Sequence, residues 1–124
     1  MIRFDNVSKR YANGGDALSD IAFEIGTGEM VFVTGHSGAG KSTLIKLLAL
    51  IERPTRGQIM IDGEHLATTR GARIAAYRQR LGLVFQDYRL LEDRSVADNV
   101  ALPLKIAGCE HAELQKRVRA ALDL

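Results

Sequence analysis

A glycine-rich turn followed by a lysine and two hydroxyl residues is the stretch of this sequence best suited to chemistry. The turn fits the pattern G-x-x-x-x-G-K-[ST] and lies between two apolar runs, 30–33 and 44–48. Glycines allow positive φ, so successive backbone N–H groups can point at one anion, and a helix that begins there adds its free amides and its dipole. The spacing therefore predicts a loop that binds the phosphates of a nucleoside triphosphate. The residues expected to bind it are Gly35, Ser37, Gly38, Ala39, Gly40, Lys41, Ser42 and Thr43.

Three side chains at the end of this loop have distinct predicted roles. Lys41 is expected to reach the β- and γ-phosphates as a positive charge, which makes it a candidate catalytic residue. The Ser42 hydroxyl is expected to ligate Mg²⁺, and the Thr43 hydroxyl can donate to the phosphate nearest the nucleoside. ATP with Mg²⁺ is therefore the predicted cofactor pair.

The composition is that of an ordinary globular domain. The chain has 124 residues, of which 46% are apolar and 26% charged, and its net charge is +2. That charge is too small to favour a nucleic-acid partner, and the basic stretch from Arg70 to Arg80 is interpreted as a solvated helix face. No apolar run has the length of a signal peptide core or a membrane span, so we expect a cytoplasmic protein. Cys109 is a single cysteine, which excludes an internal disulfide.

The loop must be positioned by an α/β fold, because strand-like and helix-like patterns alternate along the chain. Continuous apolar runs at 30–33 and 81–85 predict strands buried on both faces, as in a parallel sheet. Alternating patterns predict further strands at 2–5, 21–25 and 57–61, with a polar loop over 6–15 and a tight turn at Asp62–Gly63. Helices are expected over 44–51, 68–80, 95–107 and 111–124. Ser95 and Asp98 have the spacing of a helix N-terminal cap, and Gly108 that of a helix stop.

The chain resembles the N-terminal half of an ATP-binding cassette (ABC) ATPase over essentially its whole length. The resemblance rests on the stretches 1–4, 34–44, 51–54, 85–87, 90–91 and 93–104. It implies a partial P-loop nucleotide-binding domain over residues 1–124, with a parallel core sheet, helices and an N-terminal antiparallel β subdomain. The family's signature motif, its second acidic strand and its switch histidine do not occur in this sequence. We therefore expect a fragment that binds ATP and does not hydrolyse it alone.

The resemblance also implies two further site residues and several partners. Tyr11 matches the aromatic that stacks on adenine, and Gln86 matches the glutamine that contacts Mg²⁺ or the attacking water, as a second catalytic candidate. Read without the family, the residues alone favour a packing role for Tyr11 and an ordinary loop position for Gln86. The stretch from Gln86 to Pro103 is expected to contact an integral membrane partner on the cytoplasmic face of the inner membrane. A homodimer is expected for the full-length protein, and self-association or strand exchange for this chain.

Three other functions stay open at this stage. Within the family, the pattern is similar both to a cell-division branch and to a lipoprotein-release branch. A non-catalytic nucleotide-binding module would need only residues 35–43. A P-loop kinase would use the same loop together with an arginine-rich lid, for which the stretch from Arg70 to Arg80 is the candidate.

Overall fold

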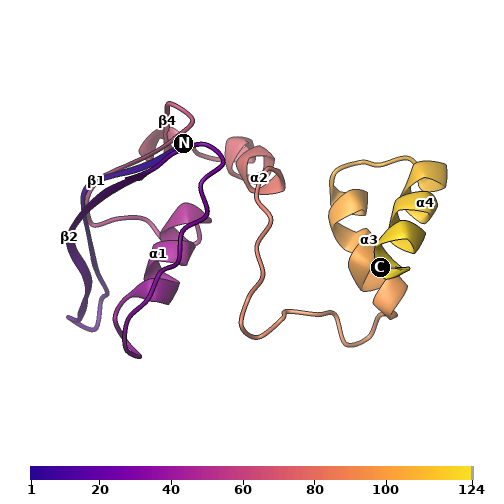
Figure 1. The fold of residues 1–124 in the computed structure, drawn as a ribbon, viewed down its shortest axis with the longest axis horizontal. Helices are drawn as coiled ribbons and strands as arrows, with labels where there is room; N and C mark the ends of the chain where they lie inside the picture. Colours follow the sequence, from indigo (N-terminus) through magenta and orange to yellow (C-terminus); the bar gives the residue numbers. More distant parts are fainter. Residues whose placement is uncertain (124) are drawn as a thin grey trace. The chain divides into compact units, whose positions relative to one another are not determined.

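The computed structural model describes residues 1–123, which form two compact units, residues 1–81 and residues 82–123. The expectation that the last helix reaches residue 124 lies outside the described residues. Figure 1 shows an antiparallel sheet and two helices in the first unit, and a pair of helices in the second. In the described part of the chain, no helix has both the length and the apolar character needed to cross a bilayer.

The sheet of the first unit has four antiparallel strands in the order β2-β1-β3-β4. The strands are β1 (Ile2–Arg10), β2 (Asp16–Ile25), β3 (Arg56–Ile61) and β4 (Glu64–His65). Strand β1 lies in the middle and pairs Phe4 with Phe23 on one side and with Ile59 on the other. The Phe4 and Phe23 rings stack with their centroids 4.5 Å apart. This sheet is the N-terminal antiparallel subdomain that the sequence predicted.

Strand β1 continues through residues 6–10, where the sequence predicted a loop, so that expectation was wrong. The register shifts between Phe4 and Val7, and Asn6 has a φ of 47°, which marks a β-bulge. The bulge places both Phe4 and Val7 on the buried face, although their spacing breaks the alternation of a regular strand. Gly57 is required opposite it, because a Cβ there would lie 2.2 Å from the Asn6 carbonyl oxygen.

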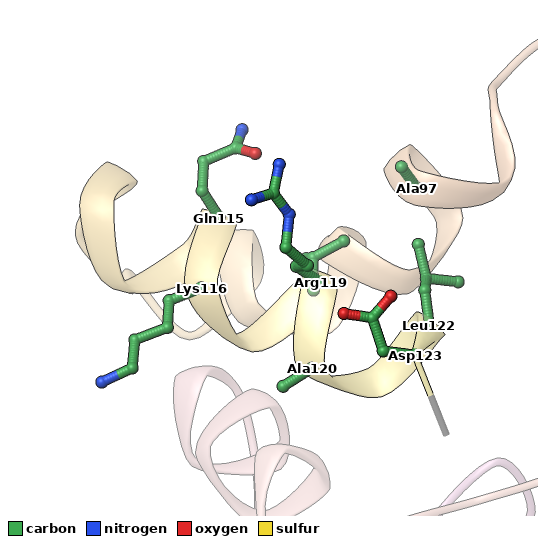
Figure 2. A pocket seen from close by; sticks show the side chains of 8 residues that line it. Ala97, Gln115, Lys116, Arg119, Ala120, Leu122 and Asp123 are labelled. Atoms are coloured by element: carbon green, nitrogen blue, oxygen red, sulfur yellow. The ribbon is translucent and has the colours of Figure 1, made fainter.

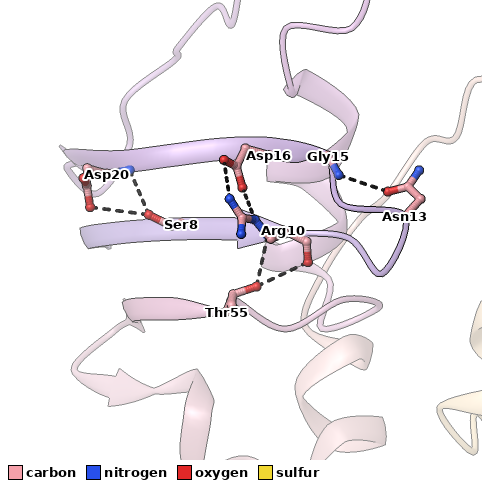
Figure 3. Close-up of polar contacts among 7 residues, drawn as sticks. All are labelled: Ser8, Arg10, Asn13, Gly15, Asp16, Asp20 and Thr55. Atoms are coloured by element: carbon pink, nitrogen blue, oxygen red, sulfur yellow. Dashed lines mark hydrogen bonds and ion pairs between the residues drawn. The ribbon is translucent and has the colours of Figure 1, made fainter.

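The β1–β2 hairpin is closed by polar contacts that extend β2 back to Asp16 (Figure 3). Arg10 donates two hydrogen bonds to the Asp16 carboxylate, at 2.6 and 3.0 Å. The Arg10 guanidinium lowers the pKa of Asp16 below its ordinary value. Thr55 accepts a bond from the Arg10 backbone N–H at 3.0 Å and so ties the strand that follows α1 to the hairpin.

Helix α1 (Lys41–Leu48) follows the glycine-rich loop and packs against the sheet (Figure 1). Its buried side chains Leu44 and Leu47 join Phe4 and Val7 in the core cluster of this unit. The sequence predicted a helix buried nearly all round, but Ile45 is 41% exposed, so α1 buries one face only. Helix α1 ends at Leu48, before the predicted end at residue 51, because the backbone of Leu50 is left-handed with a φ of 53°.

The rest of the first unit contains a short hairpin and two helical segments. Asp62 and Gly63 form the predicted turn between β3 and β4, with φ values of 49° and 81°, as a type I′ turn requires. The 3₁₀ helix η1 (Leu66–Thr68) and helix α2 (Ala72–Gln79) replace the single helix predicted over 68–80. Gly71, with a φ of 56° and a ψ of −134°, separates the two segments.

The predicted strands at 30–33 and 81–85 are not part of any sheet among the described residues, so these two expectations were wrong. Met30 and Phe32 are 84% and 83% exposed, and Val84 is 91% exposed. A strand of a parallel core needs hydrogen-bonding neighbours on both sides and helices on both faces. Residues 1–123 supply neither to these segments, so Met30, Phe32 and Val84 face solvent, whereas Leu81 packs against the core of the first unit.

The second unit contains helices α3 (Val96–Ile106) and α4 (His111–Leu122), which pack on each other through Ala101, Leu114 and Val118. The predicted cap of α3 is confirmed, because the Ser95 hydroxyl accepts a hydrogen bond from the Asp98 backbone N–H at 3.1 Å. The predicted stop is confirmed as well, since Gly108 has a φ of 75° just after α3. The apolar face predicted for α4 is shorter than expected, because Ala121 and Leu122 are exposed.

Candidate nucleotide-binding site

The loop over residues 35–43, called the phosphate loop from here on, has the backbone conformation that its glycines allow. Gly35, Gly38 and Gly40 have φ values of 149°, 82° and 90°. A turn within the loop is closed by a hydrogen bond from the Ala39 N–H to the His36 carbonyl, at 3.2 Å. Ser37, Gly38, Ala39 and Ser42 are all exposed, so the loop is open to a ligand.

Gly40 sets how closely the phosphate loop approaches strand β2. A Cβ at this position would lie 2.5 Å from the Ala17 carbonyl oxygen and 2.6 Å from the Leu18 Cδ2. By contrast, a Cβ on Gly38 would meet nothing within 4 Å. Gly38 is therefore needed for its φ alone, whereas Gly40 is needed both for its φ and for the close packing of loop on strand.

The N-terminus of α1 supplies the donors of the site. The first intrahelical bond runs from the Leu44 N–H to the Gly40 carbonyl at 2.9 Å. The amides of Lys41, Ser42 and Thr43 have no acceptor four residues earlier within the helix, as at any helix start. The first turn of α1 contains no acidic residue, so nothing there opposes an anion at the positive end of the helix dipole.

The Lys41 side chain curls back over the phosphate loop. Its ammonium donates hydrogen bonds to the carbonyls of Gly35 and His36, at 2.6 and 2.8 Å. The Lys41 ammonium therefore lies against the backbone of the phosphate loop. The interaction of Lys41 with a γ-phosphate stays a prediction.

The structure brings Tyr11 and Thr43 together, although they are far apart in the sequence. The Tyr11 hydroxyl lies 3.4 Å from the Thr43 Oγ1, and Thr43 is buried at 8% exposure. The Tyr11 ring is half-buried, and the Lys9 ammonium lies 5.0 Å from its centroid. Lys9 is held there by an ion pair with Glu52 at 2.7 Å. Stacking of adenine on Tyr11 stays a prediction.

Gln86 belongs to the second unit, whereas the phosphate loop belongs to the first. Gln86 is exposed and follows residues 82–85, which belong to no helix or strand. The next two non-glycine residues with positive φ are Tyr88 and Arg89, at 52° and 49°. The role of Gln86 toward Mg²⁺ or water stays a prediction, as does that of the Ser42 hydroxyl. Residues 1–123 contain no group of three or more His, Cys, Asp or Glu side chains that could hold a metal ion.

Sequence reasoning missed several side chains that fix the elements around the loop. Arg53 donates to the carbonyls of Leu66, Ala67 and Thr69, the last at 2.6 Å. Arg78 was interpreted as part of a solvated face, yet its guanidinium bonds two carbonyls at the end of α1. Nothing in the local sequence signals such contacts, because the acceptors are backbone atoms of distant residues.

A groove of about 720 Å³ lies on the second unit along α4 (Figure 2). Figure 2 shows the Gln115 and Arg119 side chains close together on one side of the helix and Lys116 pointing away from them. None of the residues predicted to bind nucleotide lines this groove.

A glycine-rich loop that leads into a helix N-terminus with free amides is the phosphate-binding arrangement of P-loop nucleotide-binding domains. The model of the ABC transporter family matches residues 18–124. The chain belongs to this family, which confirms the resemblance and the predicted fold class.

The relatives include ATP-binding proteins named for cell division and for methionine import. The chain is 50% identical over 123 residues to the cell division ATP-binding protein FtsE of Escherichia coli K12, covering 99% of the chain and 55% of that protein. It is 45% identical over 127 residues to the methionine import ATP-binding protein MetN 2 of Yersinia pestis bv. Antiqua, covering 100% of the chain and 39% of that protein. The chain thus spans about half the length, or less, of these relatives.

Solved structures of ABC cassettes share the fold. The post-hydrolysis dimer of the ATP-binding cassette MJ0796, bound to ADP and Pi, matches with a TM-score of 0.90 and 30% identity. The match covers 99% of this chain and 56% of that one. The cbiO1 protein of Clostridium perfringens, part of the ABC transporter complex cbiONQ, matches with a TM-score of 0.81 and 31% identity.

Proposed function

We propose that this chain is the ATP-binding part of an ABC ATPase and that it holds ATP with Mg²⁺ at the phosphate loop. The observation that carries the proposal is Gly40, where a side chain would collide with the Ala17 carbonyl at 2.5 Å. A backbone pressed this closely on a strand, at the open start of a helix, fits a cradle for phosphates. Family membership supports the same ligand.

Each residue of the site then has a role. The Lys41 ammonium gives up its hydrogen bonds to the Gly35 and His36 carbonyls and donates instead to oxygens of the β- and γ-phosphates. The backbone amides of residues 38–43 surround these phosphates. The Ser42 hydroxyl, which is exposed, ligates Mg²⁺. Mg²⁺ supplies charge neutralisation of the phosphates when it is bound. Thr43 and Tyr11, whose hydroxyls lie 3.4 Å apart, border the nucleoside side. Gln86 acts toward Mg²⁺ or the attacking water.

We further propose that the whole protein couples ATP binding and hydrolysis to a membrane partner, as an FtsE-like subunit would with an FtsX-like protein in bacterial cell division. The 50% identity to FtsE supports this role. In this proposal, the stretch from Gln86 to Pro103 contacts the membrane partner. The whole protein acts as a homodimer on the cytoplasmic face of the inner membrane. An import role is the second candidate, favoured by the 45% identity to a methionine import protein.

Nucleotide titration tests the proposal on the 124-residue chain. We expect a fluorescent ATP analogue to bind in the presence of Mg²⁺, and Lys41→Ala to weaken binding about tenfold or more, because a charge-assisted bond to phosphate is lost. Lys46→Ala, on the same helix, is the matched control and should stay within about twofold of the wild type. We expect phosphate release no faster than that of Lys41→Ala.

Two results would contradict the proposal. Folded wild-type chain that binds no Mg-ATP would remove the nucleotide site altogether. Equal losses in Lys41→Ala and Lys46→Ala would show that binding does not depend on the phosphate loop. Transfer of phosphate to a small acceptor would instead support the P-loop kinase alternative.

A further inference from the structure

The end of α1 opposite the phosphate loop is held by two neighbouring side chains of α2. The Tyr77 hydroxyl donates to the Leu48 carbonyl at 2.5 Å. The Arg78 guanidinium donates from Nε to the Ala49 carbonyl at 3.0 Å and from Nη2 to the Leu50 carbonyl at 2.9 Å. Three consecutive carbonyls at the end of α1 are thus bonded from one helix.

The backbone at this end of α1 needs such support. Leu50 has a φ of 53°, where glycine is usual, and its N–H donates to the Leu47 carbonyl at 3.1 Å. The Ile51 N–H donates to the Lys46 carbonyl at 2.9 Å, which completes a Schellman motif. The side chain of Leu50 is buried at 7% exposure, so the core keeps leucine at a position where its backbone is strained.

Arg78 also complements the charge of α1. The carbonyls of Leu48, Ala49 and Leu50 lie at the negative end of the helix dipole, where a cation is favourable. Tyr77 is buried, and burial raises the pKa of its hydroxyl to about 12, so it acts as a neutral donor. Both groups therefore present donors to the end of the helix.

Helix α1 connects these contacts to the nucleotide site. It has eight residues and is therefore about 12 Å long. Leu44 and Leu47 fix one face of it in the core, and its N-terminal amides form the phosphate site. A short rigid helix held at one end has little freedom at the other, so the contacts at residues 48–50 constrain the position of the loop.

We infer that Arg78, together with Tyr77, is a positioning residue for the phosphate loop and sets the affinity of the site for a nucleoside triphosphate. This inference rests on the proposed function. The direct attraction between Arg78 and phosphate is a small contribution, because a separation of about 12 Å exceeds the Debye length of about 8 Å at physiological salt. The effect of Arg78 is transmitted through α1.

The test compares Mg-ATP affinity in four variants of the whole chain, each checked for native circular dichroism. We expect Arg78→Ala to weaken binding about tenfold, and Arg78→Lys, which keeps the charge and one donor group, by about threefold. Tyr77→Phe keeps the buried ring and should weaken binding by about threefold. Arg73→Ala is the control, since it removes an exposed arginine of the same helix and should stay within about twofold.

Rescue separates positioning from a general loss of stability. Methylguanidinium added to Arg78→Ala should restore the wild-type affinity, and should leave Arg73→Ala unchanged. The inference would be overturned if Arg78→Ala were folded and less stable but bound Mg-ATP with the affinity of the wild type. Arg78 would then only stabilise the fold. Wild-type chain that binds no Mg-ATP would instead overturn the proposed function itself. The two failures are thus told apart by the wild-type titration.

Discussion

Among single residues, Gly38 and Gly40 of the phosphate loop have similar φ values, so the costs of replacing them by alanine can be compared directly. Alanine at Gly38 meets open space, so its cost is that of a left-handed alanine alone, about 1 kcal/mol. Alanine at Gly40 adds a collision with the backbone of β2 at 2.5 Å. We expect Gly40→Ala to lower the free energy of unfolding by about 3 kcal/mol or more. Urea unfolding of both variants measures the difference, and equal costs would show that the loop does not pack on β2 as described.

At the scale of an element, the cap of α3 predicts a pH dependence. The Ser95 hydroxyl bonds the Asp98 carboxylate at 2.7 Å and Lys105 pairs with it at 3.1 Å, and both lower the pKa of Asp98. Because the pKa of Asp98 is lower in the folded state, its carboxylate stabilises α3 at every pH above the ordinary pKa of 3.8. This stabilisation is lost as the pH falls below 3.8 and through the lower pKa of the folded state.

Chemical shifts of α3 followed by NMR measure this effect. The helical shifts of residues 96–99 should decay below about pH 4 in the wild type. Asp98→Asn should reduce this decay of the helical shifts with falling pH. Asp93→Asn, in the loop before the helix, should show the same pH profile of the shifts as the wild type. An Asp98→Asn profile that matches the wild type would mean that another group titrates there.

Elements whose signals are local could be predicted from the sequence. The cap at Ser95 and the turn at Asp62–Gly63 depend on residues within four positions of each other, and both are present. The bulge in β1 depends on Gly57, which is far along the chain, and the contact of Arg78 depends on carbonyls 28 and 29 residues away. Such partners are invisible to a pattern read along one segment, which is why the course of β1 was mispredicted and why the bonds of the exposed Arg78 to α1 were not predicted.

At the scale of the whole molecule, the exposed apolar segment 30–33 is the feature that most favours self-association. Met30 and Phe32 are 84% and 83% exposed, and Val31 and Val33 are each 50% exposed. An extended apolar segment with unpaired backbone groups is a template for strand pairing with another chain. We therefore expect the chain to form concentration-dependent oligomers through this segment. The predicted self-association or strand exchange stays a prediction.

Substitution of Phe32 by glutamate tests this expectation, because a charge on an open strand opposes pairing. In sedimentation velocity over a range of protein concentrations, the wild type should show a growing oligomer fraction and Phe32→Glu a much smaller one. Leu90→Glu, which alters an apolar side chain that is 65% exposed outside this segment, is the matched control and should behave as the wild type. If Leu90→Glu suppressed oligomers as strongly as Phe32→Glu, association would follow general surface hydrophobicity. A wild type that stayed monomeric at the highest concentration would mean that solvent-exposed residues 30–33 do not pair between chains.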